Sequence, residues 1–389
     1  MPEDRETYEL RDLSLDRLRL RSSAKWTSFP PDVLPAFVAE MDFPLARPVK
    51  DALIEAIEID DTGYANASGS DLASSFAGYA SRHWDWPVDP EQVTATTDVV
   101  GGLRALLDLV TGPLEGVIIN PPVYFPFFSI IPEVGSEIIE VPIDPTGRLD
   151  LPAIEEAFRA GARAMILCSP HNPAGTVPSR SELRQLAEAA AEADAWVLAD
   201  EIHAPLTLPG ATHTPFLSVS EAARECGICV TSASKAFNIA GLGCAVIVTA
   251  SERAARVVSR LPAGATHPGH LGVIASRAAF RWGDNWLEQV VDQLDFNRTF
   301  LADLLAERLP GAVYRPPEAG YLAWIDARKL GLGPDPSIPI LDEARVAVSS
   351  GPGFGRAGVG HFRLNIGTSP NLIEAAVGSI AEKLPGLIE

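Results

Sequence analysis

The chain has 389 residues and a formal net charge of −20, which is long enough for two domains with full hydrophobic cores. Its hydrophobic content of 47% and charged content of 21% are ordinary for a globular protein. The excess of negative charge argues against nucleic acid and anionic membrane surfaces as partners, because both are negatively charged themselves. No apolar run approaches the ~20 residues of a membrane span, and the charged N-terminus lacks the apolar core of a secretory signal.

Cysteine usage points to a reducing compartment. The chain has four cysteines, few for its length, as in cytoplasmic proteins. Cys226 and Cys229 form a CxxC pair, but no second CxxC or histidine pair completes a zinc set. Cys229 lies in an apolar run, so we interpret it as a core residue. The sequence therefore predicts a cytoplasmic protein without a metal site.

In chain order, residues 1–45 predict an N-terminal arm that contributes to a small domain. Residues 46–280 predict a large domain, which begins with an amphipathic helix over residues 49–59, and residues 281–389 predict a C-terminal small domain that begins with a long helix over residues 284–309.

Short apolar runs alternate with helical patterns through the large domain. The predicted strands cover residues 116–119, 138–141, 164–168, 196–199, 228–230 and 246–249, with helices over residues 151–159 and 181–194. This alternation is typical of an α/β fold with a mostly parallel central sheet covered by helices. Residues 351–355, Gly-Pro-Gly-Phe-Gly, lack the strand before and the helix after that a dinucleotide loop requires, so we interpret them as a turn.

Polar residues follow three of these strands. Asp200 ends one apolar run, Asn172 follows another in a proline-rich turn, and Lys235 follows a third, with Ser232 and Ser234 beside it. The carboxyl ends of parallel strands are where α/β sheets bind ligands. Together with Arg363 near the C-terminus, this set fits pyridoxal phosphate (PLP) enzymes, which use a lysine that bonds the cofactor and an acid that faces its pyridine nitrogen.

From Ala39-Glu-Met-Asp-Phe43 to Arg363-Leu-Asn-Ile-Gly367, the chain resembles fold-type I PLP enzymes of the class I/II aminotransferase superfamily. Within it, the chain most resembles the MalY/PatB group of cysteine-S-conjugate (cystathionine) β-lyases. The resemblance implies PLP as cofactor, a small-molecule amino acid as substrate, and a homodimer.

It also implies roles for individual residues. Lys235 bonds the cofactor and takes the Cα proton of the substrate, while Asp200 keeps the pyridine nitrogen protonated. Asn172 donates to the phenolate oxygen of the ring, and Tyr124, in Pro121-Pro-Val-Tyr124, stacks on the ring. Arg363 holds the substrate carboxylate, and Tyr124 and Asn172 also border the substrate.

The phosphate ligands implied by the resemblance come from several segments. They are the hydroxyls of Ser232 and Ser234, the backbone amides at the start of a helix, and a tyrosine that reaches across from the neighbouring subunit. Unpaired amides of a first helical turn attract anions. The amides belong to Val99, Val100 and Gly101, and the tyrosine is Tyr64.

Three departures from the aminotransferase pattern affect the predicted activity. Thr97-Asp98 replaces Pro-Gly or Pro-Ser before the phosphate helix, where Asp98 fits a helix N-cap. Gly243 replaces an arginine that commonly follows the lysine by eight residues, and His203 replaces a tyrosine after the aspartate. The last two are traits of the MalY/PatB group, and His203 is either a residue beneath the cofactor ring or a packed histidine.

We therefore expect a carbon–sulfur β-lyase that cleaves L-cystathionine or other L-cysteine S-conjugates to pyruvate, ammonia and a thiol. An aminotransferase of broad amino-acid specificity shares nearly all of these residues and is the alternative. A regulatory protein that retains a PLP fold is a further alternative from another class.

Overall fold

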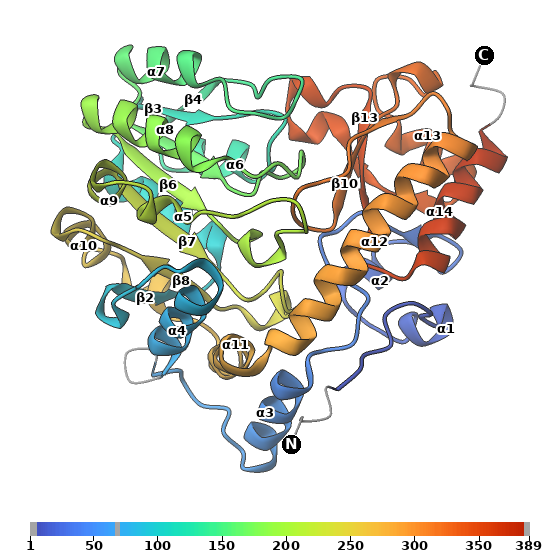
Figure 1. Cartoon of the computed structure of the whole chain (residues 1–389), viewed down its shortest axis with the longest axis horizontal. Helices are drawn as coiled ribbons and strands as arrows, with labels where there is room; N and C mark the ends of the chain where they lie inside the picture. The colour runs from blue at the N-terminus through green and yellow to red at the C-terminus, as the bar shows by residue number, and fades with distance from the viewer. Residues whose placement is uncertain (1–5, 67–70, 385–389) are drawn as a thin grey trace.

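The computed structural model describes residues 6–66 and 71–384. A central seven-stranded sheet has the strand order β2-β8-β7-β6-β5-β3-β4 (Figure 1). Its strands are β2 (Val93–Thr96), β3 (Gly116–Ile119), β4 (Glu137–Glu140), β5 (Ala164–Cys168), β6 (Trp196–Asp200), β7 (Gly227–Thr231) and β8 (Ala245–Val248). The pairs among β4, β3, β5, β6 and β7 are parallel, whereas β8 runs antiparallel to β7 and β2.

Every residue of β5, β6 and β7 is buried, because helices cover both faces of this sheet. Alternate residues of a strand point to opposite faces, so Val197 and Ala199 belong to one core cluster and Trp196 and Leu198 to the other. The first cluster packs under α4 (Leu72–Trp84), α7 (Leu151–Arg159), α8 (Arg180–Glu192), α9 (Glu221–Cys226) and α11 (His270–Trp282). The second packs under α5 (Val99–Val110), α6 (Phe127–Glu133) and α10 (Glu252–Val258).

A smaller antiparallel sheet lies to the right of the central sheet in Figure 1. It has the order β12 (Ser349–Ser350), β13 (His361–Asn365), β10 (Leu322–Asp326) and β9 (Val313–Tyr314). The helices α12 (Asp284–Arg308), α13 (Ser337–Ala344) and α14 (Pro370–Lys383) accompany it.

The N-terminal arm joins this smaller region. It contains α1 (Leu15–Leu18), α2 (Ala24–Thr27) and β1 (Leu34–Pro35), before α3 (Arg47–Glu58) begins. Strand β1 pairs in parallel with β11 (Val346–Ala347), more than 300 residues away. The domain bounds at residues 45/46 and 280/281 stay a prediction.

Elements with clear sequence signals have nearly the predicted bounds. Helix α7 and strand β5 begin and end as predicted, and α12 ends one residue early, at Arg308. Asp150 caps α7 by accepting from the Ala153 amide. Helices α4 and α11 were not predicted. Residues 351–354 form a short 3₁₀ turn, in which a Cβ atom on Gly351 would collide with the carbonyl oxygens of His361 and Gly358.

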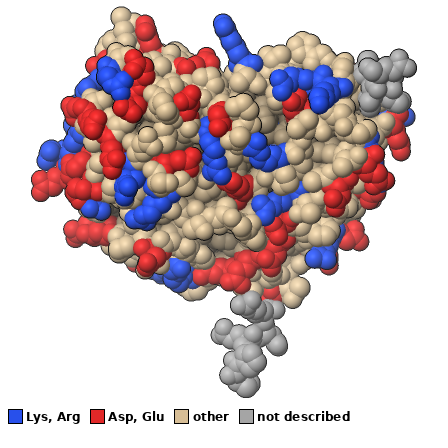
Figure 2. All heavy atoms as spheres, turned by 45° about the horizontal axis from the view of Figure 1, so that its top comes forward, with Lys and Arg blue, Asp and Glu red and all other residues tan. Residues whose placement is uncertain are grey.

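On the face shown in Figure 2, lysines and arginines are interspersed with aspartates and glutamates. All four cysteines are free and buried. Within residues 6–66 and 71–384, no helix is long and apolar enough to cross a bilayer, and no three metal-ligand side chains gather.

Candidate active site

A pocket lies where the carboxyl ends of β5, β6 and β7 meet the amino end of α5. Eight of the predicted site residues line it, from five separate segments of the chain. The lining residues are Ala39, Asp98, Val99, Val100, Tyr124, Cys168, Asn172, Asp200, Ile202, His203, Ser234, Lys235, Ala240, Gly243 and Cys244. The parallel strands bring these segments to one edge of the sheet, as the sequence predicted.

Lys235 lies in the loop after β7, and its amine points into the pocket. Nζ donates a hydrogen bond to the carbonyl oxygen of Ala39, at 2.9 Å. Burial lowers the pKa of Lys235 from 10.5 to about 8, the Arg363 guanidinium lowers it too, and the carboxylates of Asp200 and Glu40 oppose these effects. Burial disfavours the charged form of a lysine, so a useful fraction of this amine is neutral and nucleophilic near neutral pH.

Asp200 ends β6 and is buried. Its Oδ1 accepts a hydrogen bond from the Ile202 amide, at 3.1 Å. Burial raises the pKa of Asp200 from 3.8 to about 7, although the Ile202 amide and the charge of Lys235 lower it. A cationic partner in the pocket would favour the carboxylate form.

Asn172, in the turn after β5, contacts Arg363, which lies on β13 of the smaller sheet. Arg363 Nη1 donates to Asn172 Oδ1, at 2.9 Å, and Nη2 donates to the Phe37 carbonyl and the Ser349 hydroxyl, both at 3.1 Å. The guanidinium also lies 4.9 Å from the ring centroid of Phe354. Burial lowers the pKa of Arg363 to about 10, so the side chain stays cationic at neutral pH and is suited to a carboxylate.

Tyr124 and His203 line the pocket between these charged groups. Burial raises the pKa of the Tyr124 hydroxyl, and the Asp200 carboxylate adds to the rise. Burial lowers the pKa of His203 to about 3, helped by the charges of Lys235 and Arg363, so its ring is neutral. His203 Nδ1 is buried and has no hydrogen-bond partner among the described residues.

The first turn of α5 borders the other end of the pocket. Asp98 is its N-cap, and its carboxylate accepts from the Gly101 amide at 2.8 Å. Val99 and Val100 line the pocket, whereas Gly101 does not. The cap therefore occupies one of the three amides predicted to bind phosphate and leaves two.

The two predicted serines differ in position. Ser234 lines the pocket, whereas the Ser232 hydroxyl donates to the Cys244 carbonyl at 2.6 Å and accepts from the Ser234 amide at 3.0 Å. Ser232 is thus bound within its own loop. Tyr64 lies between α3 and α4, is 99% exposed, and is not part of the pocket of its own subunit.

Several lining residues were not predicted. Ala39 lines the pocket. Tyr321 is not among the lining residues and no motif marks it, but its hydroxyl donates to the same Ala39 carbonyl that Lys235 contacts, at 3.0 Å. Gly243, which replaces the arginine common in aminotransferases, also lines the pocket, and its φ is +61°. The only available signal for Ala39 was its place at the start of the Ala39–Phe43 motif.

These residues fit PLP. The pocket offers an amine of lowered pKa, a buried carboxylate, an aromatic side chain, a helix N-terminus and an unpartnered buried imidazole nitrogen. An aldehyde, a pyridine nitrogen, a flat ring and a phosphate would find these groups as partners.

Known proteins resemble this chain over nearly its whole length. The chain is 41% identical to a protein named "Putative cystathionine beta-lyase" from Mycobacterium tuberculosis (strain CDC 1551 / Oshkosh), over 96% of this chain and 98% of that one. It is 36% identical to the cystathionine beta-lyase of Corynebacterium glutamicum, over 95% and 99%. Among solved structures, a "putative plp-dependent beta-cystathionase" from Corynebacterium diphtheriae matches with a TM-score of 0.93 and 37% identity, over 97% and 99%.

The family model for aminotransferase class I and II matches residues 39–380. This confirms the predicted fold-type I architecture. Members of this PLP-dependent family act on small amino-acid substrates and typically form dimers. The chain belongs to the class I and II aminotransferase family.

Proposed function

We propose that this protein is a PLP-dependent carbon–sulfur β-lyase that cleaves L-cystathionine or other L-cysteine S-conjugates to pyruvate, ammonia and a thiol. One observation carries the proposal: Lys235, Asp200 and Asn172 share one pocket, with Arg363 bonded to Asn172, in a chain similar to proteins named cystathionine beta-lyase over nearly its full length. Gly243 and His203 in the same pocket favour a lyase over an aminotransferase, because they stand where aminotransferases carry arginine and tyrosine.

When bound, PLP supplies an electron-withdrawing ring that makes the Cα proton of an attached amino acid acidic. Lys235 is suited to bond the cofactor and afterwards to take this proton, because burial holds its pKa at about 8. Asp200, at the end of β6, would hold a proton on the pyridine nitrogen of the cofactor. Asn172 lies beside Arg363 and would donate to the ring oxygen.

Arg363 would bind the substrate carboxylate, Tyr124 would stack on the cofactor ring, and His203 would be a neutral neighbour. Overall, the Cα–H and Cβ–S bonds break, the thiol leaves with a proton, and water converts the three-carbon remainder to pyruvate and ammonia. No second substrate is needed, whereas amino transfer requires a keto acid.

At the phosphate end, we propose that the amides of Val99 and Val100 and the hydroxyl of Ser234 bind the phosphate. Gly101 donates to the Asp98 cap, and Ser232 braces the lysine loop. These two predicted ligands therefore act through their neighbours. Without an arginine at position 243, the phosphate depends on amides, hydroxyls and a ligand from outside the subunit.

That outside ligand is Tyr64 in our proposal. The side chain is 99% exposed and does not line its own pocket, which suits a residue that completes the pocket of a second copy in a homodimer. Tyr64→Phe should weaken PLP binding while leaving the dimer intact, as measured by cofactor titration and light scattering. A cytoplasmic location is also proposed, because free thiols are typical of reducing compartments and all four cysteines are free.

The decisive experiment is pyruvate release from L-cystathionine by PLP-loaded protein without added keto acid. Catalytic release of pyruvate and a thiol, lost in Lys235→Ala, supports the lyase. Amino transfer that appears only with keto acid, and no pyruvate from any cysteine conjugate, would replace it with the aminotransferase.

A further inference from the structure

Residues 37–42, which we call the strap, form neither helix nor strand, and Ala39 in their middle lines the pocket. Each of their six consecutive carbonyl oxygens accepts a hydrogen bond from a side chain. The donors are Arg363 and Ser349 to Phe37, Asn365 to Val38, Lys235 and Tyr321 to Ala39, Lys25 and Asn365 to Glu40, Arg21 and Asn238 to Met41, and Arg21 to Asp42. The position of the strap is therefore set by side chains and not by a regular backbone ladder.

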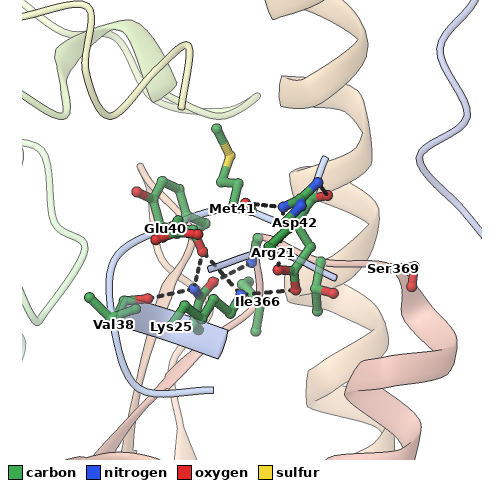
Figure 3. Close-up of polar contacts among 12 residues, drawn as sticks. Arg21, Lys25, Val38, Glu40, Met41, Asp42, Ile366 and Ser369 are labelled. Carbon is green, nitrogen blue, oxygen red and sulfur yellow. Dashed lines mark hydrogen bonds and ion pairs between the residues drawn. The ribbon is translucent and has the colours of Figure 1, made fainter. Parts of the chain in front are cut away.

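Lys25 and Asp42 form a buried ion pair at one end of the strap. Lys25 Nζ lies 2.8 Å from Asp42 Oδ2, and the two side chains are 1% and 3% exposed. Figure 3 shows Arg21 and Lys25 from the N-terminal arm meeting Glu40, Met41 and Asp42 of the strap. The Asp42 amide also donates to the Gly367 carbonyl, at 2.8 Å, so this residue joins the arm, the strap and the segment after β13.

Such a pair is not explained by stability alone. Removing two charges from water is costly, and a neutral, well-packed pair of similar volume is often as stable. Here Lys25 does more than neutralise Asp42, because its amine also donates to the Glu40 carbonyl at 3.1 Å. The pair thus fixes both a side chain and the backbone within one residue of Ala39.

Ala39 is the point where the strap meets the catalytic chemistry. It lines the pocket, and its carbonyl lies 2.9 Å from Lys235 Nζ. Asn365 holds the carbonyls on both sides of it, at 2.7 Å each. The strap therefore places a backbone carbonyl against the amine and contributes to its burial.

We propose that the Lys25–Asp42 pair positions Lys235 from outside the pocket, by fixing the strap so that the Ala39 carbonyl covers the Lys235 amine. Lys25 and Asp42 touch neither cofactor nor substrate and act through the backbone of residues 39–42. The proposal rests on the proposed function only for the bond between Lys235 and PLP, not for the reaction that follows.

The test measures how fast the full-length, cofactor-stripped chain bonds added PLP, followed by the visible absorbance of the product across pH. Only the neutral amine reacts, so the pH at which the rate is half of its maximum reports the pKa of Lys235. The groups that face this amine are Arg363, Asp200, Glu40, His203 and Tyr321, and none of them is changed.

Lys25→Met is expected to move the half-maximal pH upward by about one unit, because a loosened strap admits water and solvation favours the ammonium. Amides of residues 38–42 should also exchange hydrogen faster in the PLP-loaded protein. Asp42→Asn is the milder second variant, since it keeps the side-chain shape and removes the charge. A profile that stays in place in both folded variants overturns the proposal.

The double variant Lys25→Met/Asp42→Leu separates positioning from stability. Removing both charges should restore the unfolding temperature. The pH profile should stay shifted, because the Glu40 carbonyl still lacks the donor that Lys25 supplies and keeps only Asn365. If the pH profile returned to that of the wild type together with the unfolding temperature, the pair would have only a structural role.

Arg47→Met is the matched control, because it breaks the exposed Arg47–Asp51 pair on the neighbouring helix α3 and should leave the profile unchanged. Wild-type protein that bonds PLP but releases no pyruvate would refute the lyase and leave this test intact. Wild-type protein that does not bond PLP would overturn both proposals.

Discussion

The edge of the central sheet and the strap both contribute to the pocket, but they are built differently. At the sheet edge, Asp200 and Lys235 follow β6 and β7, whose pairing and burial fix where each strand ends. In the strap, side chains from the arm, the lysine loop and β13 hold one carbonyl after another. The comparison shows that Asp200 and Lys235 are positioned by the ends of buried strands. The strap beside them is positioned by many single side-chain hydrogen bonds.

The largest effect should come from the sheet edge. Lys235→Ala is expected to reduce pyruvate release by about 10³-fold or more, because it removes both the cofactor bond and the base. The unfolding temperature should change little, since the amine makes one hydrogen bond to Ala39. Lys329→Ala, at an exposed lysine, is the control. Retained turnover in Lys235→Ala would contradict the assignment.

Arg363 belongs to both regions, because it contacts Asn172 at the sheet edge and Phe37 in the strap. Arg363→Lys should raise KM by about 10- to 100-fold, because an ammonium does not reproduce the two-pronged contact with a carboxylate. Steady-state kinetics would show this. An unchanged KM would place the substrate carboxylate elsewhere.

Asn365 tests the strap itself. Asn365→Ala removes the donor to the Val38 and Glu40 carbonyls and the acceptor for the Gly367 amide. The loss of these three buried hydrogen bonds should lower the free energy of unfolding by about 3 kcal/mol, measured by chemical denaturation. If the free energy of unfolding fell by no more than it does for an Asn→Ala change at an exposed position, the strap would not depend on single contacts.

Asp200 gives a pH-dependent test of the sheet edge. Its pKa of about 7 in the folded chain lies above its ordinary 3.8, so the folded state binds the proton more tightly than the unfolded state. The contribution of this group to stability is therefore favourable at acid pH and lost as pH rises to about 7, on the order of 1.4 kcal/mol per unit of pKa difference.

Asp200→Asn should consequently raise the unfolding temperature of the cofactor-stripped protein at pH 8 more than at pH 4, while weakening PLP binding. Thermal unfolding at the two pH values checks this. A stabilisation that is equal at both would show that the carboxylate is not destabilised by burial.

The smallest effect should come from the helix that borders the phosphate end. Asp98→Ala removes the N-cap of α5 and should cost about 1 kcal/mol of stability. The Gly101 amide becomes available to an anion at the same time, so phosphate should bind more tightly to the variant. Calorimetric titration with inorganic phosphate measures this, and weaker binding would contradict it.

The sequence by itself determined the sheet and the residues at its edge. Buried strands read as continuous apolar runs, and a polar residue directly after such a run must lie at the strand end. Asp200 was found in this way, and Asn172 and Lys235 lie in the loops that follow two other runs. The bounds of β5 and α7 followed from an apolar run and a helical pattern. The family motifs then identified the cofactor and the most similar group of enzymes.

Only the tertiary structure decided which predicted ligands face the pocket and what covers it. Ser232 and Ser234 are equivalent in the sequence, but one hydroxyl bonds the Cys244 carbonyl, and Gly101 is occupied by the Asp98 cap. The Ala39 carbonyl reaches Lys235 across 196 positions of the chain. A backbone carbonyl is the same in every residue, so no side-chain pattern marks the one that a distant fold brings to the catalytic amine.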